Sequence, residues 1–209
     1  MQLVGMLDSP FVRRVAVSLK LLGYDFVHRN WSVGKDFEQI RAFNPLGRVP
    51  TLVLDDGTVL CESAAILDWL DEQAGDRALL PRSGPARQRA LQLMALATGA
   101  AEKGVLQLYE GAFRPASMRH QPWVDRCRAQ MDGALGELEK AAAARDGGWL
   151  VTDAMSQADI TVTCVYTFAS EALQFTASTR FPALKALAAR CEALPVFRAH
   201  HQPFFVPHS

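Results

Sequence analysis

Apolar residues recur with a helical period near the N-terminus of this chain, directly after a short apolar segment. Residues 3–6 predict a β-strand, and the apolar side chains that follow are spaced to lie on one face of a helix: Val12, Val15, Ala16, Leu19 and Leu22. Gly23 predicts the end of this helix. Residues 25–29 predict a second strand, which is expected to run parallel to the first because a helical crossover joins them.

A hairpin and a further helix are predicted in the next segment. Residues 51–54 and 58–61 are rich in β-forming side chains and flank the turn sequence Asp55-Asp56-Gly57. Residues 33–43 are polar and predict a short irregular helix before the hairpin. Ser63 is placed to cap the helix after it. The resulting order, βαβ-α-ββα, is that of a thioredoxin-like α/β domain.

Two domains are therefore expected, a thioredoxin-like domain at residues 1–76 and an all-α domain at residues 86–209. Residues 77–85 contain proline and glycine and predict the linker. In the second domain, apolar periodicity predicts four helices followed by a short tail after Pro195: residues 86–113, 123–145, 157–173 and 182–194. Ser156-Gln157-Ala158-Asp159 has the spacing of a capping box, and the apolar run after it predicts a helix buried at the domain centre.

Composition and charge narrow the class of protein. Hydrophobic residues make up 49% of the 209 residues, enough for a sizeable core. The 22 basic and 22 acidic side chains cancel, which argues against general nucleic-acid binding. The four cysteines are far apart and predict neither a zinc site nor a disulfide framework: Cys61, Cys127, Cys164 and Cys191. With no long apolar run and no leader sequence, we expect a cytoplasmic protein without a membrane span.

Three polar segments of the first domain offer groups for binding. Ser9-Pro10 is a common helix start with serine as the N-cap, but a hydroxyl beside free helix amides can also stabilise an anion such as a thiolate. Val49-Pro50 lies between a loop and a strand, where proline suits a strand start or an edge. Glu62-Ser63 is again a helix start. Each segment thus has a structural interpretation, and the residues alone leave a functional one open beside it.

Taken together, these segments resemble the glutathione site of the serine-type cytosolic glutathione S-transferases, most of all the bacterial and plant tau-like members. The stretches that carry the resemblance are SPFVRRV at residues 9–15, NPLGRVP at residues 44–50 and ESAAI at residues 62–66. Their order along the chain, followed by a long helical half, makes the resemblance more specific than any one of them alone.

The resemblance implies glutathione as co-substrate and no metal. Ser9 would stabilise the glutathione thiolate and act as the catalytic residue. The backbone of Val49, beside a proline that is usually cis in thioredoxin-like domains, would pair with the cysteinyl part of the tripeptide. Glu62 would hold the γ-glutamyl ammonium group, and Ser63 the γ-glutamyl carboxylate.

The remaining contacts that the resemblance implies lie around the far ends of the two substrates. Lys35 or Arg48 would pair with the glycyl carboxylate, although a solvated Lys35 fits the sequence equally well. A pocket for the hydrophobic electrophile would lie between the two domains, lined by Phe11, Leu106, Tyr109 and Phe113. The last three fall on one stripe of the long helix, which is also typical of an ordinary helical core.

Two classes of function follow from the resemblance. In the first, the protein is an enzyme that adds the glutathione thiolate to an electrophilic small molecule. Conjugation is the default reaction, and isomerisation, dehalogenation and peroxide reduction are variants. In the second, it is a binding or regulatory protein that keeps the same fold without turnover. Similar proteins form two-fold dimers, so a homodimer is expected.

Overall fold

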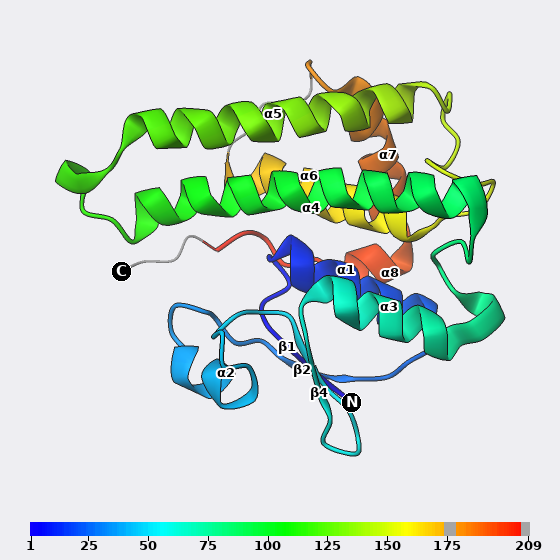
Figure 1. The fold of residues 1–209 in the computed structure, drawn as a ribbon, viewed down its shortest axis with the longest axis horizontal. Helices are drawn as coiled ribbons and strands as arrows, with labels where there is room; N and C mark the ends of the chain where they lie inside the picture. The colour runs from blue at the N-terminus through cyan, green and yellow to red at the C-terminus, as the bar shows by residue number, and fades with distance from the viewer. Residues whose placement is uncertain (174–178, 206–209) are drawn as a thin grey trace.

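A four-stranded mixed sheet lies at the base of the molecule in the computed structural model, which describes residues 1–173 and 179–205 (Figure 1). Its strands occur in the order β2-β1-β3-β4, with these bounds: β1 Gln2–Val4, β2 Val27–Arg29, β3 Thr51–Val53 and β4 Val59–Cys61. Strand β1 is parallel to β2 and antiparallel to β3, and β3 is antiparallel to β4. The predicted parallel pair and the predicted hairpin are both confirmed.

Helices α1 (Pro10–Leu21) and α3 (Ser63–Ala74) pack against each other between this sheet and the helices of the second half. The predicted apolar face of α1 is buried with Leu3 of β1 and Leu52 of β3. Helix α2 (Phe37–Phe43) lies apart from α1 and α3, beside the sheet. It begins four residues later than expected, because Ser32 donates its backbone N–H to the Asp36 carboxylate at 2.8 Å and holds the preceding residues in a turn.

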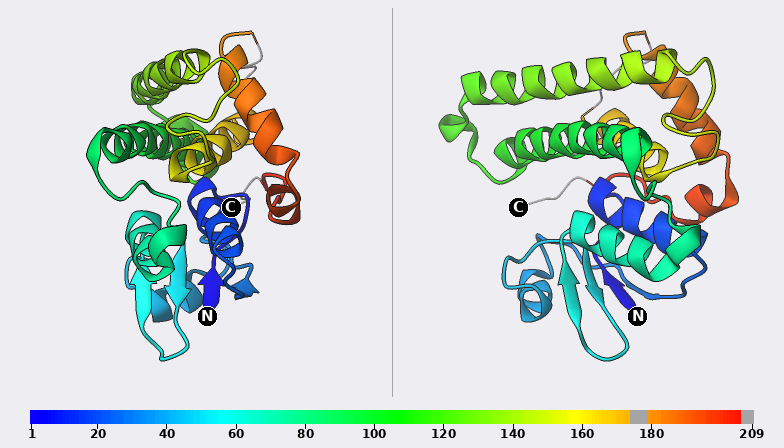
Figure 2. Two further views of the ribbon diagram at one scale, coloured as in Figure 1. Left: turned by 90° about the vertical axis from the view of Figure 1, so that its right-hand side faces the viewer. Right: turned by 45° about the vertical axis from the view of Figure 1, so that its right-hand side comes forward.

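The rest of the described chain is helical. Two long helices lie side by side, and shorter helices pack behind them and near one end of the pair (Figures 1 and 2). The bounds are α4 Gly84–Ala112, α5 Gln121–Ala143, α6 Gln157–Ala172, α7 Pro182–Glu192 and α8 Pro195–Ala199, with short 3-10 helices η1 at Gly75–Arg77 and η2 at Ala116–Met118. The sequence predicted only a tail where α8 forms. Proline at its first turn favours this helix, and the buried Arg13 guanidinium donates to the carbonyls of Phe197 and His200 at its C-terminal end.

Helix α6 is the centre of the helical half, as the sequence predicted. Asp159 completes the capping box by accepting from the backbone N–H of Ser156 at 2.8 Å, and its other oxygen accepts from the N–H of Leu150 at 2.8 Å. Helix α6 also packs on α1 of the first half, so the two halves share a buried interface. None of the helices described in residues 1–173 and 179–205 is both long enough and apolar enough to cross a membrane.

Candidate functional site

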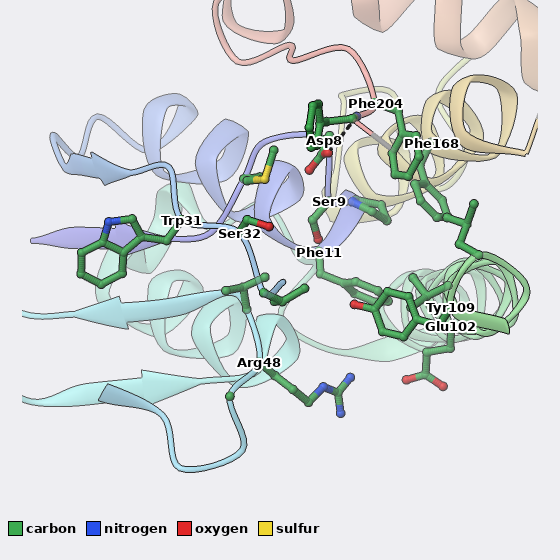
Figure 3. Close-up of a pocket in the computed structure, with 18 of the residues that line it drawn as sticks. Asp8, Ser9, Phe11, Trp31, Ser32, Arg48, Glu102, Tyr109, Phe168 and Phe204 are labelled. Atoms are coloured by element: carbon green, nitrogen blue, oxygen red, sulfur yellow. Dashed lines mark hydrogen bonds between the residues drawn. The ribbon is translucent and has the colours of Figure 1, made fainter. Parts of the chain in front are cut away.

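A cavity of about 600 Å³ opens between the α/β half and the helical half (Figure 3). Its walls come from the loop before α1, residues 31–33, residues 47–49, the C-terminal part of α4, helix α6 and the segment 204–205. Seven of the ten site residues expected from the sequence line it: Ser9, Phe11, Arg48, Val49, Leu106, Tyr109 and Phe113. Glu62, Ser63 and Lys35 are not among its lining residues. The fold thus gathers most of the expected site from segments far apart in the sequence.

Ser9 lies at the N-cap of α1, and its side chain forms part of the cavity wall (Figure 3). Its Oγ accepts the backbone N–H of Val12 at 3.5 Å, a long and therefore weak capping bond. The hydroxyl keeps its own proton for donation. Pro10 has no N–H and the Val12 amide already bonds to Oγ, so Phe11 supplies the remaining amide of the first turn. This geometry suits both a helix cap and a group that donates a hydrogen bond to an anion in the cavity.

Val49 lies beside Ser9 in the cavity wall, and the Val49-Pro50 peptide bond is cis. Gly5 allows this close packing, because a Cβ on Gly5 would lie 2.6 Å from Val12 Cγ2 and 2.7 Å from Val49 Cβ. The side chain of Asn44, which fixes the turn before Val49, was not predicted to have a role at the site. Asn44 is buried, and its Nδ2 donates to the carbonyl of Arg48 at 2.9 Å. An asparagine-proline pair before a strand is the signal that could have identified it.

Glu62 and Ser63 lie close to Val49-Pro50 because β3 and β4 pair Thr51 with Cys61. Glu62 has a positive φ of 68°, which is unusual for a residue other than glycine and is often found at functional sites. Its half-exposed carboxylate pairs with the Arg48 guanidinium at 3.5 Å. Glu62 therefore lies at the edge of the cavity on the side of Arg48, and Ser63 next to it in the chain is buried.

Ser63 is the first residue of α3 rather than its N-cap, so the predicted cap is wrong by one position. Glu62 occupies the N-cap position, and its carbonyl accepts the N–H of Ile66 at 3.0 Å. The Ser63 hydroxyl is 2.7 Å from Arg14 Nη2, which donates to it. It is therefore held by a contact from α1 and does not cap its own helix.

Arg14 is the buried group that sequence reasoning missed. It is 2% exposed, and its other terminal nitrogen donates to the Thr161 hydroxyl of α6 at 3.3 Å. Within residues 1–173 and 179–205 no carboxylate lies within ion-pair distance of it, and its Nε has no partner. Burial lowers the pKa of Arg14 to about 10, and the negative charge of Glu62 partly opposes this shift. The guanidinium therefore stays charged at neutral pH and places a positive charge behind Ser63.

The two candidates for the glycyl carboxylate lie in different surroundings. Arg48 lines the cavity, whereas Lys35 is exposed, with its ammonium 5.3 Å from the centre of the Phe205 ring. No cluster of three or more metal-ligating side chains occurs in the part of the chain that the structure describes.

The aromatic stripe of α4 faces the cavity rather than the core. Leu106, Tyr109 and Phe113 are 37%, 39% and 47% exposed, and the Tyr109 and Phe113 rings meet edge to face at 5.0 Å. This exposure excludes the interpretation of the stripe as ordinary helical core. Five further lining residues were not predicted from the sequence: Asp8, Trp31, Phe168, Phe204 and Phe205. For the last two, the signal was a pair of consecutive aromatic residues in the C-terminal tail.

Family models match both halves of the chain. The N-terminal domain of glutathione S-transferase matches residues 3–78, and the C-terminal domain of glutathione S-transferase matches residues 103–195. The uncharacterized GST-like protein YibF of Escherichia coli K12 is 32% identical over 78% of this chain and 79% of its own length.

Solved structures agree with these matches. A glutathione S-transferase from Methylobacterium radiotolerans in complex with glutathione sulfonate has a TM-score of 0.89 and 29% identity, over 100% of this chain and 95% of that one. A glutathione transferase family member from Pseudomonas fluorescens Pf-5 with bound glutathione has a TM-score of 0.85 and 32% identity, over 97% of this chain and 99% of that one. Both likenesses extend over the two halves that form the cavity.

Proposed function

Since the chain belongs to the glutathione S-transferase family, we propose that it is a glutathione transferase acting on a small hydrophobic electrophile. The observation that carries the proposal is the joint position of Ser9 and Val49 in one wall of a cavity whose opposite wall is the exposed stripe of α4. A thiol held at the first wall faces an apolar volume large enough for a small molecule.

In this proposal the tripeptide binds along the edge of the α/β half. The backbone of Val49 pairs with its cysteinyl part, and Glu62 receives the γ-glutamyl ammonium group. The γ-glutamyl carboxylate binds at Ser63, where the first-turn amides of α3 and the Arg14 guanidinium both favour an anion. Arg48 is preferred to Lys35 for the glycyl carboxylate because it lines the cavity.

Ser9 then stabilises the thiolate. A thiolate is a far stronger nucleophile than a thiol, and lowering the thiol pKa by ~2 units requires ~2.7 kcal/mol of preferential stabilisation. One charge-assisted hydrogen bond from Ser9 together with the positive end of α1 can supply it. The thiolate sulfur forms a bond to an electrophilic carbon. Either the bond from that carbon to a leaving group breaks and the group departs with its electron pair, or the π bond at that carbon breaks and its displaced electron pair takes a proton from water.

Turnover of simple electrophiles tests the proposal directly. Purified protein with glutathione and a neutral chloronitrobenzene or enone should form the conjugate faster than the same mixture without protein. Formation of the conjugate should also saturate with glutathione. Binding of glutathione without any turnover across such a panel would instead favour a binding or regulatory protein of the same fold.

The proposed assembly is a homodimer, as is common for symmetric oligomers. Because the net charge is zero, little electrostatic repulsion opposes self-association. We also propose that the protein is located in the reducing cytoplasm, which the four free cysteines fit. Sedimentation at micromolar concentration should give a species of about twice the 23.0 kDa chain. A single species with the mass of one chain would contradict the dimer.

A further inference from the structure

The cavity wall opposite Arg48 carries a carboxylate within an aromatic surface. Asp8 directly precedes Ser9 and lines the cavity together with Phe168 and Phe204. Figure 3 shows these three side chains grouped at one end of the cavity, with Ser9 between them and Arg48. The Phe168 and Phe204 rings lie 6.0 Å apart, nearly perpendicular to each other. This end of the cavity therefore offers the faces and edges of several rings around one acidic group.

The negative charge of Asp8 is stabilised by hydrogen bonding but not by an ion pair. Its Oδ2 accepts the backbone N–H of Phe205 at 3.2 Å, and among residues 1–173 and 179–205 no basic group forms an ion pair with it. Burial raises the pKa of Asp8, the backbone amides of Phe205, Ser9 and Asp8 itself oppose this shift, and the nearby negative charge of Glu171 adds to it. A positive charge brought into the cavity beside Asp8 would relieve both unfavourable effects.

Among residues 1–173 and 179–205, the basic side chains near the cavity leave Asp8 without an ion pair. Arg48 is at the opposite end and already pairs with Glu62 at 3.5 Å. Lys35 is not a lining residue: its exposed ammonium lies over the ring of Phe205, the residue whose amide bonds to Asp8, and forms no ion pair with Asp8. The charges that line the cavity are thus separated: Arg48 lies on the side proposed for glutathione, and the partly buried carboxylate of Asp8 lies on the side left for the electrophile.

We propose that the electrophile subsite selects hydrophobic molecules that carry an organic cation, with Asp8 as the specificity-determining residue. The inference rests on the proposed function for the position of glutathione. A quaternary or protonated amine is attracted to the faces of aromatic rings and to a carboxylate, and the walls here supply both. An anionic molecule of the same shape would instead meet the like charge of Asp8 in a partly desolvated place.

Equilibrium binding of unreactive analogues tests this preference without turnover. The probes are three naphthalenes of similar size: (2-naphthylmethyl)trimethylammonium, 2-naphthylacetamide and 2-naphthylacetate. Each is titrated by calorimetry into protein saturated with glutathione. We expect the cation to bind at least about tenfold more tightly than the anion, with the amide between them.

Asp8→Asn is the informative variant, because the amide oxygen can still accept from Phe205 while the charge is removed. In this variant the affinities for the cation and the anion should come within about threefold of each other. Glu102→Gln is the matched control, since Glu102 also lines the cavity but lies on the side of Arg48 (Figure 3), and the preference should persist in it.

Equal affinity for cation and anion in the wild type, or an unchanged preference in Asp8→Asn, would overturn the inference. Failure of the proposed function would show in a different measurement, the absence of turnover with the neutral electrophile, so the two failures are distinguishable.

Discussion

Ser9→Ala should lower kcat/KM about 10- to 150-fold, the rate equivalent of losing one charge-assisted hydrogen bond of ~1.5–3 kcal/mol. Its expected effect on the glutathione dissociation constant is small, because the proposed binding contacts lie at Val49, Glu62 and Ser63. The loss should therefore appear in the chemical step.

The pH dependence of kcat/KM distinguishes catalysis from helix capping at Ser9. Without the hydroxyl, the thiolate is less stable, so the thiol pKa rises and the acidic limb of the profile moves to higher pH. If Ser9 is only a cap, the profile stays in place and the variant loses about 1 kcal/mol of stability or less. The long 3.5 Å bond to Val12 favours the small end of that range.

A second N-cap serine provides the control for Ser9→Ala. Ser156 caps α6 far from the cavity, so Ser156→Ala should lower the melting temperature without moving the pH profile. Measuring both properties on the same preparations separates lost stability from lost catalysis. A profile that stays at the wild-type position in Ser9→Ala would remove this residue from the mechanism.

Ser63→Ala should weaken glutathione binding about 10- to 100-fold, since a hydrogen bond to a charged group contributes ~1.5–3 kcal/mol. The free energy of unfolding should fall as well, by about 1–3 kcal/mol, because Arg14 Nη2 is left buried without its acceptor. Calorimetric titration with glutathione and chemical denaturation measure the two effects.

Thr161→Val is the matched control for this second prediction. The Thr161 hydroxyl accepts from the other terminal nitrogen of Arg14, so its loss also leaves a buried donor unpaired. It removes no proposed contact with glutathione, however, so affinity should stay within about threefold of the wild type. If Ser63→Ala matches Thr161→Val in both measurements, Ser63 has a structural role only and the γ-glutamyl carboxylate binds elsewhere.

The parts of the fold that the sequence predicted are those determined locally. The 3.6-residue period of α1, the Asp-Gly turn of the hairpin and the capping box at Ser156-Asp159 each lie within a few neighbouring residues. At α8 and at Ser63, two of the places where the prediction differed, a contact between residues far apart in the sequence determines the structure. Helix α8 lies against Arg13, and Ser63 is held by Arg14, 49 positions earlier in the sequence.

The same distinction applies to the site. The positions of Ser9 and Val49-Pro50 follow from a helix start and a strand start, whereas their proposed roles came from the resemblance to the glutathione S-transferases. Asp8, Phe204 and Phe168 could not be predicted, because they meet only when the C-terminal segment returns to the loop before α1. That return depends on bonds such as Leu7 N–H to Gln202 Oε1 at 3.1 Å, which joins residues 195 positions apart.

Segment 201–205 lies in a different part of the chain from the residues proposed to bind glutathione. It forms part of the electrophile side of the cavity through Phe204 and Phe205, and it contacts the rest of the protein mainly through side chains such as Gln202 and through Glu171 of α6. The proposed glutathione contacts belong instead to the sheet edge and the starts of α1 and α3. In the proposed function, changes to this short segment therefore alter the electrophile side of the cavity and leave the proposed tripeptide contacts in place.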